Sequence, residues 1–235
     1  MIPIVVPLAA LVFLGLFPLT APLSELWLKP LVALAAGTYL LRFQLWPWSI
    51  VLLGLGLGDL SRSLLEMRGG TGHPFPALFY LLGYAALTAA VHHLPGKPPR
   101  YALALLPLAL GGFYGTVVLT GVERVYAFWN TLLILLFLPK TEWLLETGGL
   151  KATLVSVGLL LFLVADWAHA LLEAQGGHPL GHPLHLLPTL SYLLWTLGLS
   201  PLPLRGFLGP GLVFLGLWSM PAALLGEPGP LGLRL

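Results

Sequence analysis

The sequence predicts an all-α integral membrane protein of eight or nine transmembrane helices, built from two parallel four-helix repeats. Hydrophobic residues make up 57% of its 235 residues and charged residues only 9%, whereas a soluble domain carries about 25% charged residues. The second observation is an internal repeat. The stretch GLGDLSRSLLEMRGG (Gly56–Gly70) returns as FLVADWAHALLEAQGG (Phe162–Gly177).

The helices follow from the apolar runs, because a membrane span needs ~20 mostly apolar residues and fewer inside a packed bundle. Proline and glycine mark the joints between them. We expect helices near 3–19, 27–42, 47–67, 76–94, 101–121, 125–145, 150–174, 184–199 and 206–225. Residues 1–235 form a single polytopic domain, with one repeat at about 1–96, a second at about 100–200 and an extra C-terminal helix at about 206–225.

Lysine and arginine are more frequent in the connections after the second, fourth, sixth and eighth predicted helices than on the opposite side. Since positive loops stay in the cytoplasm, this asymmetry predicts a cytoplasmic N-terminus. We therefore expect an integral protein of a bacterial cytoplasmic (inner) membrane. No basic run suggests a nucleic acid partner, and the sequence leaves the oligomeric state open.

Asp59 and Asp166 are the only aspartates, and they are repeat-equivalent at an offset of 107 residues. An ionisable residue inside an apolar span is costly and usually functional. In a parallel repeat the two would face one another near the middle of the bilayer, at the interface between repeats. Glu66 and Glu173 each follow seven residues later, ~10 Å further along the same helix face. The pattern predicts a polar vestibule leading to two acids.

Two neighbouring buried carboxyl groups favour a state with one proton between them, which supplies an acid and an anion together. Hydrolysis through an oxocarbenium-like state needs that combination. The alternative interpretation is structural. Each aspartate would then cap a kinked backbone or pair with one of its neighbours Ser61, Arg62 and Trp167.

Histidines gather near the second aspartate, at His169, His178, His182 and His185. A zinc site needs three or four well-placed ligands. The tract GGHPLGHPLH contains prolines that prevent a regular helix, so its spacing fixes no shared face. We therefore predict no bound metal and interpret these residues, with His73 in the equivalent loop, as histidines at a polar mouth. The chain has no cysteine, which excludes disulfides and thiolate chemistry.

The chain resembles the YhhN family of membrane proteins, which includes the lysoplasmalogenases, over roughly residues 25–200. The matching residues are Lys29-Pro30, Gly58-Asp59, Phe79 to Gly83, Leu160 to Asp166, and Leu190-Ser191-Tyr192. The resemblance implies hydrolysis of the vinyl ether bond of a lysolipid, with Asp59 and Asp166 as the catalytic acid/base pair and no cofactor. Residues expected to contact the substrate are Lys29, Glu66, Tyr84, His169, Glu173 and Tyr192.

Two functions from other classes stay open at this point. Repeated helices that carry aspartates also occur in membrane sensor modules that bind a ligand without turnover. Parallel repeats with acids near the midplane equally suit a small proton-coupled transporter. Release of an aldehyde from a lysolipid would separate the hydrolase from both.

Overall fold

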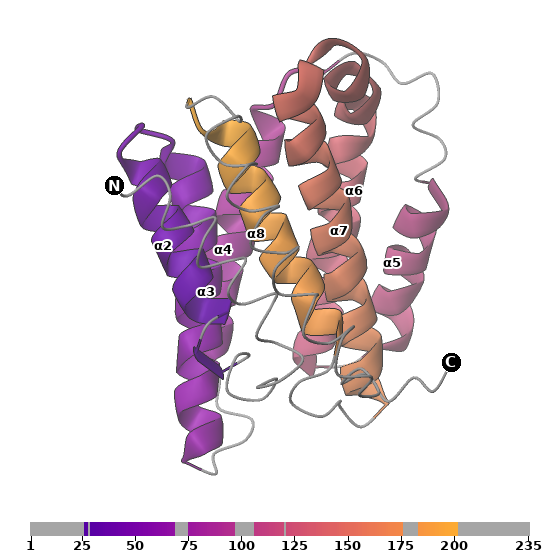
Figure 1. The fold of residues 1–235 in the computed structure, drawn as a ribbon. Coiled ribbons are helices and arrows are strands. Elements are labelled where there is room, and N and C mark those ends of the chain that lie inside the picture. The colour runs from indigo at the N-terminus through magenta and orange to yellow at the C-terminus, as the bar shows by residue number, and fades with distance from the viewer. Residues whose placement is uncertain are drawn as a thin grey trace, which may run out of the picture.

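The structure, a computed structural model, describes residues 26–27, 29–68, 75–96, 106–119, 121–175 and 183–201. Within these ranges the fold is all-helical (Figure 1). The elements are α2 (Lys29–Leu41), α3 (Trp46–Met67), α4 (Phe75–His92), α5 (Leu106–Val118), α6 (Gly121–Thr147), α7 (Gly149–Ala174), the 3-10 turn η3 (Pro183–His185) and α8 (Leu186–Leu199).

The seven helices correspond to the seven middle ranges that the apolar runs predict. The largest difference at a described boundary is the start of α6, at 121 instead of 125, while the predicted start of α5 at 101 lies outside the described residues. The helices predicted at 3–19 and 206–225 lie outside the described residues.

Proline lies in the first turn of α2, α3, α4, α5 and α8. The first turn tolerates proline because its N–H groups have no partner within the helix, and the fixed φ of proline suits the helical backbone. Gly121 and Gly149 begin α6 and α7 with φ of 62° and 64°, a left-handed conformation that glycine adopts at no steric cost. These residues explain why the helix boundaries are readable from the sequence.

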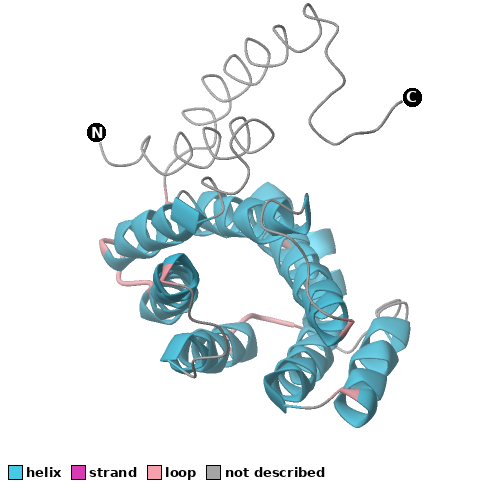
Figure 2. Ribbon diagram, turned by 90° about the horizontal axis from the view of Figure 1, so that it is seen from below, coloured by secondary structure: helices cyan, strands magenta, loops and turns pink. Residues whose placement is uncertain are grey.

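Six helices form a closed ring around a shared interior. α3 packs between α2 and α4, and α7 packs between α6 and α8. The contact of α2 with α8 and that of α4 with α6 close the ring, while α5 packs outside it against α6. Figure 2, which looks along the helices, shows them curving around this interior, and α3 and α7 run in the same direction in Figure 1. We call α2, α3, α4, α6, α7 and α8 the six-helix ring.

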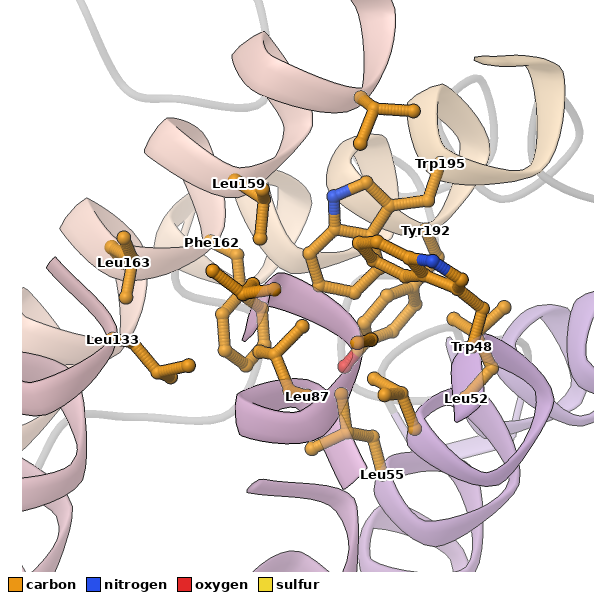
Figure 3. Close-up of a cluster of buried hydrophobic side chains, with 14 of the residues drawn as sticks. Trp48, Leu52, Leu55, Leu87, Leu133, Leu159, Phe162, Leu163, Tyr192 and Trp195 are labelled. Atoms are coloured by element: carbon orange, nitrogen blue, oxygen red, sulfur yellow. The ribbon is translucent and has the colours of Figure 1, made fainter. Parts of the chain in front are cut away.

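Large apolar and aromatic side chains fill part of the interior of the ring (Figure 3). Trp48 and Trp195 meet at 5.6 Å between ring centroids, and Phe162 lies 5.3 Å from Trp195. Leu87 and Leu133 bring α4 and α6 into the same cluster. This cluster sets the distances between the helices. The polar side chains nearby can contact one another only at those distances.

Among the described residues, three helices are long and apolar enough to cross a membrane: Trp46–Leu65, Phe75–His92 and Gly149–Leu172. Their outer surfaces suit lipid, since side chains such as Leu78 (64% exposed) and Val164 (42% exposed) would be unfavourable in water. The structure therefore supports a helical membrane protein.

The expectation of eight or nine spans is not met by the described helices. α2, α5 and α8 have 13, 13 and 14 residues, which is ~20 Å of helix against a hydrocarbon core of ~30 Å. α6 is long enough at 27 residues, but it contains Pro139 and the charged residues Glu123, Arg124, Lys140, Glu142 and Glu146. Apolar runs in the sequence do not distinguish short packed helices from full spans.

Gly54 is predicted to be essential for the packing of α3 on α4. A Cβ atom at Gly54 would lie 2.8 Å from the backbone N of Gly83 and 3.0 Å from the carbonyl of Phe79, neither of which can move alone. We expect Gly54→Ala to lower stability by about 1–3 kcal/mol, measured by thermal unfolding in detergent. Gly111→Ala is the control, because its Cβ would meet only the Trp167 side chain at 3.3 Å. Equal melting of the two variants would contradict this packing.

Candidate functional site

Asp59 lies late in α3 and is held by donors from the two helices that flank α3. Lys29 Nζ is 3.0 Å from Asp59 Oδ1, and the Tyr80 hydroxyl donates to the same oxygen at 2.8 Å. Lys29 and Asp59 are 8% and 7% exposed. A charge pair at this depth is stable only because each partner compensates the other.

The short connection between α2 and α3 explains how Lys29 reaches Asp59. Gln44, in this connection, has a φ of 59°, which turns the chain back on itself. The two helices then run antiparallel, so Lys29 at the beginning of α2 lies beside Asp59 near the end of α3. A hairpin of local sequence thus builds the ion pair.

Asp166 lies in the second half of α7 and accepts hydrogen bonds from α4 and α6. The Tyr84 hydroxyl donates to Asp166 Oδ2 through a short hydrogen bond, and Asn130 Nδ2 donates to the same oxygen at 2.5 Å. Asn130 is fully buried and Tyr84 is 2% exposed. The two aspartates therefore differ in their surroundings: an ammonium group faces Asp59, whereas uncharged donors face Asp166.

The two aspartate clusters belong to one site. Tyr80 and Tyr84, which donate to Asp59 and to Asp166, lie one turn apart on α4, and the Tyr126 ring of α6 meets both of their rings. Tyr192 of α8, which is 2% exposed, lies 6.5 Å from the ring of Phe162, which in turn lies 6.0 Å from Tyr84. Every helix of the six-helix ring thus contributes at least one polar side chain to the same interior.

Aromatic rings line the space beside the carboxyl groups. Tyr126 of α6 stacks on Tyr84 at 5.7 Å between centroids and meets Tyr80 edge-on at 6.3 Å. Phe162 lies 6.0 Å from Tyr84 and 6.5 Å from Tyr192. The carboxyl groups therefore lie beside a wall of packed aromatic rings.

Two oxygens at the site are buried without a hydrogen-bond partner among the described residues, namely Asp59 Oδ2 and Asn130 Oδ1. Buried polar atoms of this kind are rare in proteins, and each calls for an explanation. Asp59 Oδ2 is the free basic oxygen of a carboxylate whose other oxygen is already engaged.

A second polar group lies one helical turn further along α3 and α7. Arg62 Nη1 is 3.5 Å from His169 Nε2, and the His169 and His185 rings meet edge-on at 4.8 Å. His185, which ends η3, is 2% exposed. We call Arg62, His169 and His185 the Arg62 cluster.

The structure brings together five of the eight predicted site residues around the aspartates: Asp59, Asp166, Lys29, Tyr84 and Tyr192. His169 lies nearby in the Arg62 cluster. The side chains of Glu66 and Glu173 lie outside the described residues, and so do His73, His178 and His182. Among the residues that are described, no three His, Asp or Glu side chains are grouped as metal ligands would be.

The aspartates' hydrogen-bond partners in the structure are not the neighbours that the structural interpretation named. Asp59 is held by Lys29 and Tyr80 rather than by its neighbours along the helix. Ser61 Oγ instead donates to the carbonyl of Leu57 in its own helix at 2.7 Å. The observed donors come from other helices, because only these reach the buried face of α3 and α7.

Sequence reasoning missed Tyr80 and Asn130. Tyr80 precedes Tyr84 by four residues and so shares its helix face, a spacing that points to both phenols. Asn130 is the only asparagine of the chain and follows the apolar stretch Tyr126–Trp129. A single amide in an apolar stretch indicates a functional site in the same way as a single carboxyl group.

Compared with known proteins, the chain matches no protein-family model, no curated protein and no solved structure.

The Lys29–Asp59 pair is predicted to contribute strongly to stability. We expect Lys29→Met to destabilise the protein by about 3–5 kcal/mol, because it leaves a buried carboxylate uncompensated. The double variant Lys29→Met/Asp59→Asn removes both charges and should recover most of this loss. Thermal unfolding of the two variants in detergent provides the measurement, and a double variant no more stable than Lys29→Met would show that the pair is unimportant.

Proposed function

We propose that the protein is a membrane-embedded hydrolase of the lysoplasmalogenase type, which cleaves the vinyl ether bond of a lysolipid. The observation that carries the proposal is the pair of aspartates, the only two in the chain, which have unequal partners: Asp59 is buried beside Lys29, and Asp166 is half-buried beside Tyr84 and Asn130. The residues that support the resemblance to the YhhN family include both aspartates and Lys29.

The unequal partners assign different roles to the two carboxyl groups. The ammonium group of Lys29 lies 3.0 Å from Asp59 Oδ1, so this carboxyl group has a cation as its neighbour. Asp166 meets only the neutral donors Tyr84 and Asn130 at its Oδ2. Asp166 is therefore the proton donor in the proposed reaction, and Asp59 is the base.

The substrate, one water molecule and the two carboxyl groups then account for every atom and proton of the reaction. Asp166 gives its proton to the alkene carbon away from the ether oxygen, and the carbon next to that oxygen becomes an oxocarbenium centre. Asp59 Oδ2 takes a proton from water as the water oxygen bonds to this carbon, which yields a hemiacetal. The hemiacetal hydroxyl returns a proton to Asp166 while its C–O bond to glycerol breaks. Asp59 protonates the leaving oxygen, and a fatty aldehyde and a glycerol product result.

The surroundings of the aspartates fit such a substrate. The aromatic wall of Tyr84, Tyr126 and Phe162 provides contact for an alkenyl chain. Exposed apolar side chains on the helices, such as Leu78 and Val164, place the protein in lipid, from which a lysolipid can enter sideways. The proposed reaction uses no metal or cofactor.

We further propose that α2–α4 and α6–α8 belong to the two copies of the four-helix repeat, at about 1–96 and about 100–200. The supporting observation is that their contacts correspond pair by pair. α2·α3 corresponds to α6·α7, α3·α4 to α7·α8, and α2·α8 to α6·α4. The expected setting is a bacterial cytoplasmic membrane, with the N-terminus in the cytoplasm.

Asp59→Asn and Asp166→Asn are each predicted to lower turnover of a lysoplasmalogen by at least ~100-fold, the smallest effect usual for a general acid or base. Aldehyde release by the purified protein, followed by mass spectrometry, measures this.

Asp166→Asn should keep its melting temperature, because the amide oxygen still accepts from Tyr84 and Asn130. Asp59→Asn should melt lower, because Lys29 loses its counter-charge. Turnover that survives both changes would eliminate the mechanism, and a wild type without turnover would favour a sensor or transporter.

The assignment of the proton to Asp166 has a test that needs no substrate. Infrared difference spectra at neutral pH report the C=O stretch of a protonated carboxyl group. We expect this band in the wild-type-minus-Asp166→Asn spectrum and not in the wild-type-minus-Asp59→Asn spectrum. The reverse pattern would exchange the roles of the two residues.

A further inference from the structure

Asn130 has two polar side-chain atoms, and contacts within the described part of the protein use only one of them. Its Nδ2 donates to Asp166 Oδ2 at 2.5 Å. Its Oδ1 is buried, and no described residue donates to it. The residue is 0% exposed, and at such a position an unpaired amide oxygen is costly, whereas an apolar side chain of similar size is not. The amide oxygen therefore calls for a donor that does not come from the described residues.

Asp59 Oδ2 is in the same situation as Asn130 Oδ1. Among the buried side-chain oxygens of the described residues, only these two lack a hydrogen-bond partner. The groups that carry them are held at successive turns of α4, because Tyr80 donates to Asp59 while Tyr84 and Asn130 both donate to Asp166. Four residues of helix correspond to ~6 Å of rise, close to the span of two hydrogen bonds through one water molecule. Ordered water is the usual partner of buried polar atoms of this kind.

We propose that Asn130 is a positioning residue for the hydrolytic water, an inference that rests on the proposed function. Water has two hydrogens, and the site offers one free acceptor for each. Asp59 Oδ2 takes one hydrogen as the water oxygen bonds to the oxocarbenium carbon. Asn130 Oδ1 accepts the other, which stays on the oxygen as the hydroxyl of the hemiacetal. Because the same amide holds Asp166 through Nδ2, this hydroxyl lies beside the carboxyl group to which it next returns a proton.

Two acceptors for one nucleophile also decide which nucleophile attacks. A lysolipid has a free hydroxyl on the glycerol carbon next to the one that bears the ether, and this hydroxyl can itself bond to the oxocarbenium carbon. That bond closes a five-membered cyclic acetal, an isomer of the substrate. Asp166 supplies one proton to the alkene carbon, Asp59 receives one from the hydroxyl, and no C–O bond breaks. An alcohol has a single O–H and cannot serve both Asp59 and Asn130, whereas water can, so Asn130 favours hydrolysis over cyclisation.

The ratio of cyclic acetal to aldehyde tests this role. The purified full chain is incubated with a lysoplasmalogen, and chromatography with mass spectrometry measures both products. We expect Asn130→Leu to raise the ratio by roughly 3- to 10-fold, as for loss of one hydrogen bond, and to lower kcat with little change in KM. Asn130→Asp should keep the ratio of the wild type whatever its rate, because a carboxyl oxygen still accepts from water. A lower rate for Asn130→Leu with an unchanged ratio would overturn the proposal, because a residue that only supports the packing slows both routes alike.

Thr131→Val is the matched control on the same helix. Thr131 is buried like Asn130, but its Oγ1 donates to the Ala127 carbonyl of α6 at 2.8 Å. This variant should keep both the ratio and kcat of the wild type. A raised ratio in Thr131→Val would contradict the assignment to Asn130, since any loss of a polar group from α6 would then have the same effect.

The bound water has a second readout that needs no turnover. The O–H stretching band of a buried water shifts when the solvent is exchanged for water enriched in the heavy oxygen isotope. We expect infrared spectra to show such a band in the wild type and in Thr131→Val, and not in Asn130→Leu. If Asn130→Leu does not fold, Asn130→Val takes its place in both experiments. A band that persists without the amide would overturn the proposal, whereas a wild type with the band but without turnover would reject the hydrolase and support the water at Asn130.

Discussion

Two carboxyl groups in an apolar helix bundle have to be matched by donors, and the arrangement of the ring depends on this requirement. The side chains that donate to Asp59 do not come from α3, and those that donate to Asp166 do not come from α7. Lys29 and Tyr80 bring α2 and α4 to Asp59, while Tyr84 and Asn130 bring α4 and α6 to Asp166. Leaving a buried polar group without a partner costs more than an average hydrogen bond contributes. Alternative packings of these apolar helices, which would otherwise be similar in energy, are therefore disfavoured.

α4 has a special position in this network, because it serves both aspartates. Tyr80 and Tyr84 lie one turn apart on α4 and donate to different carboxyl groups, with Tyr126 of α6 in contact with both rings. A shift of α4 along its axis would disturb both clusters together. The close approach of α4 to α3 at Gly54 and Gly83 opposes such a shift. The two glycines thus help to keep Tyr80 and Tyr84 in register with Asp59 and Asp166.

Much of the fold could be predicted from the sequence because proline and glycine mark the helix ends directly. The number of spans could not, since hydropathy does not reveal that the described parts of α2, α5 and α8 have only 13, 13 and 14 residues. For the site, the lone aspartates pointed to the correct helices, and Lys29, Tyr84 and Tyr192 were expected near a substrate. Asn130 and Tyr80 were missed because their role depends on which helix faces Asp166 and Asp59. Packing decides which helices are neighbours in the ring, and no local sequence pattern encodes this choice.

The contact between α2 and α8 has a consequence for biosynthesis. At the end of the ring away from the Arg62 cluster, the Tyr39 hydroxyl pairs with Ser200 Oγ at 2.7 Å, and Lys151 donates to the Ser200 carbonyl at 2.5 Å. These residues join segments up to 161 positions apart, so the ring closes only when nearly all of α8 has left the ribosome. The residues that donate to Asp59 and Asp166 nevertheless precede these aspartates in the sequence or follow them closely. Lys29 is already present when Asp59 emerges, and Tyr84 and Asn130 await Asp166, so neither carboxyl group need enter the bilayer before a partner is available.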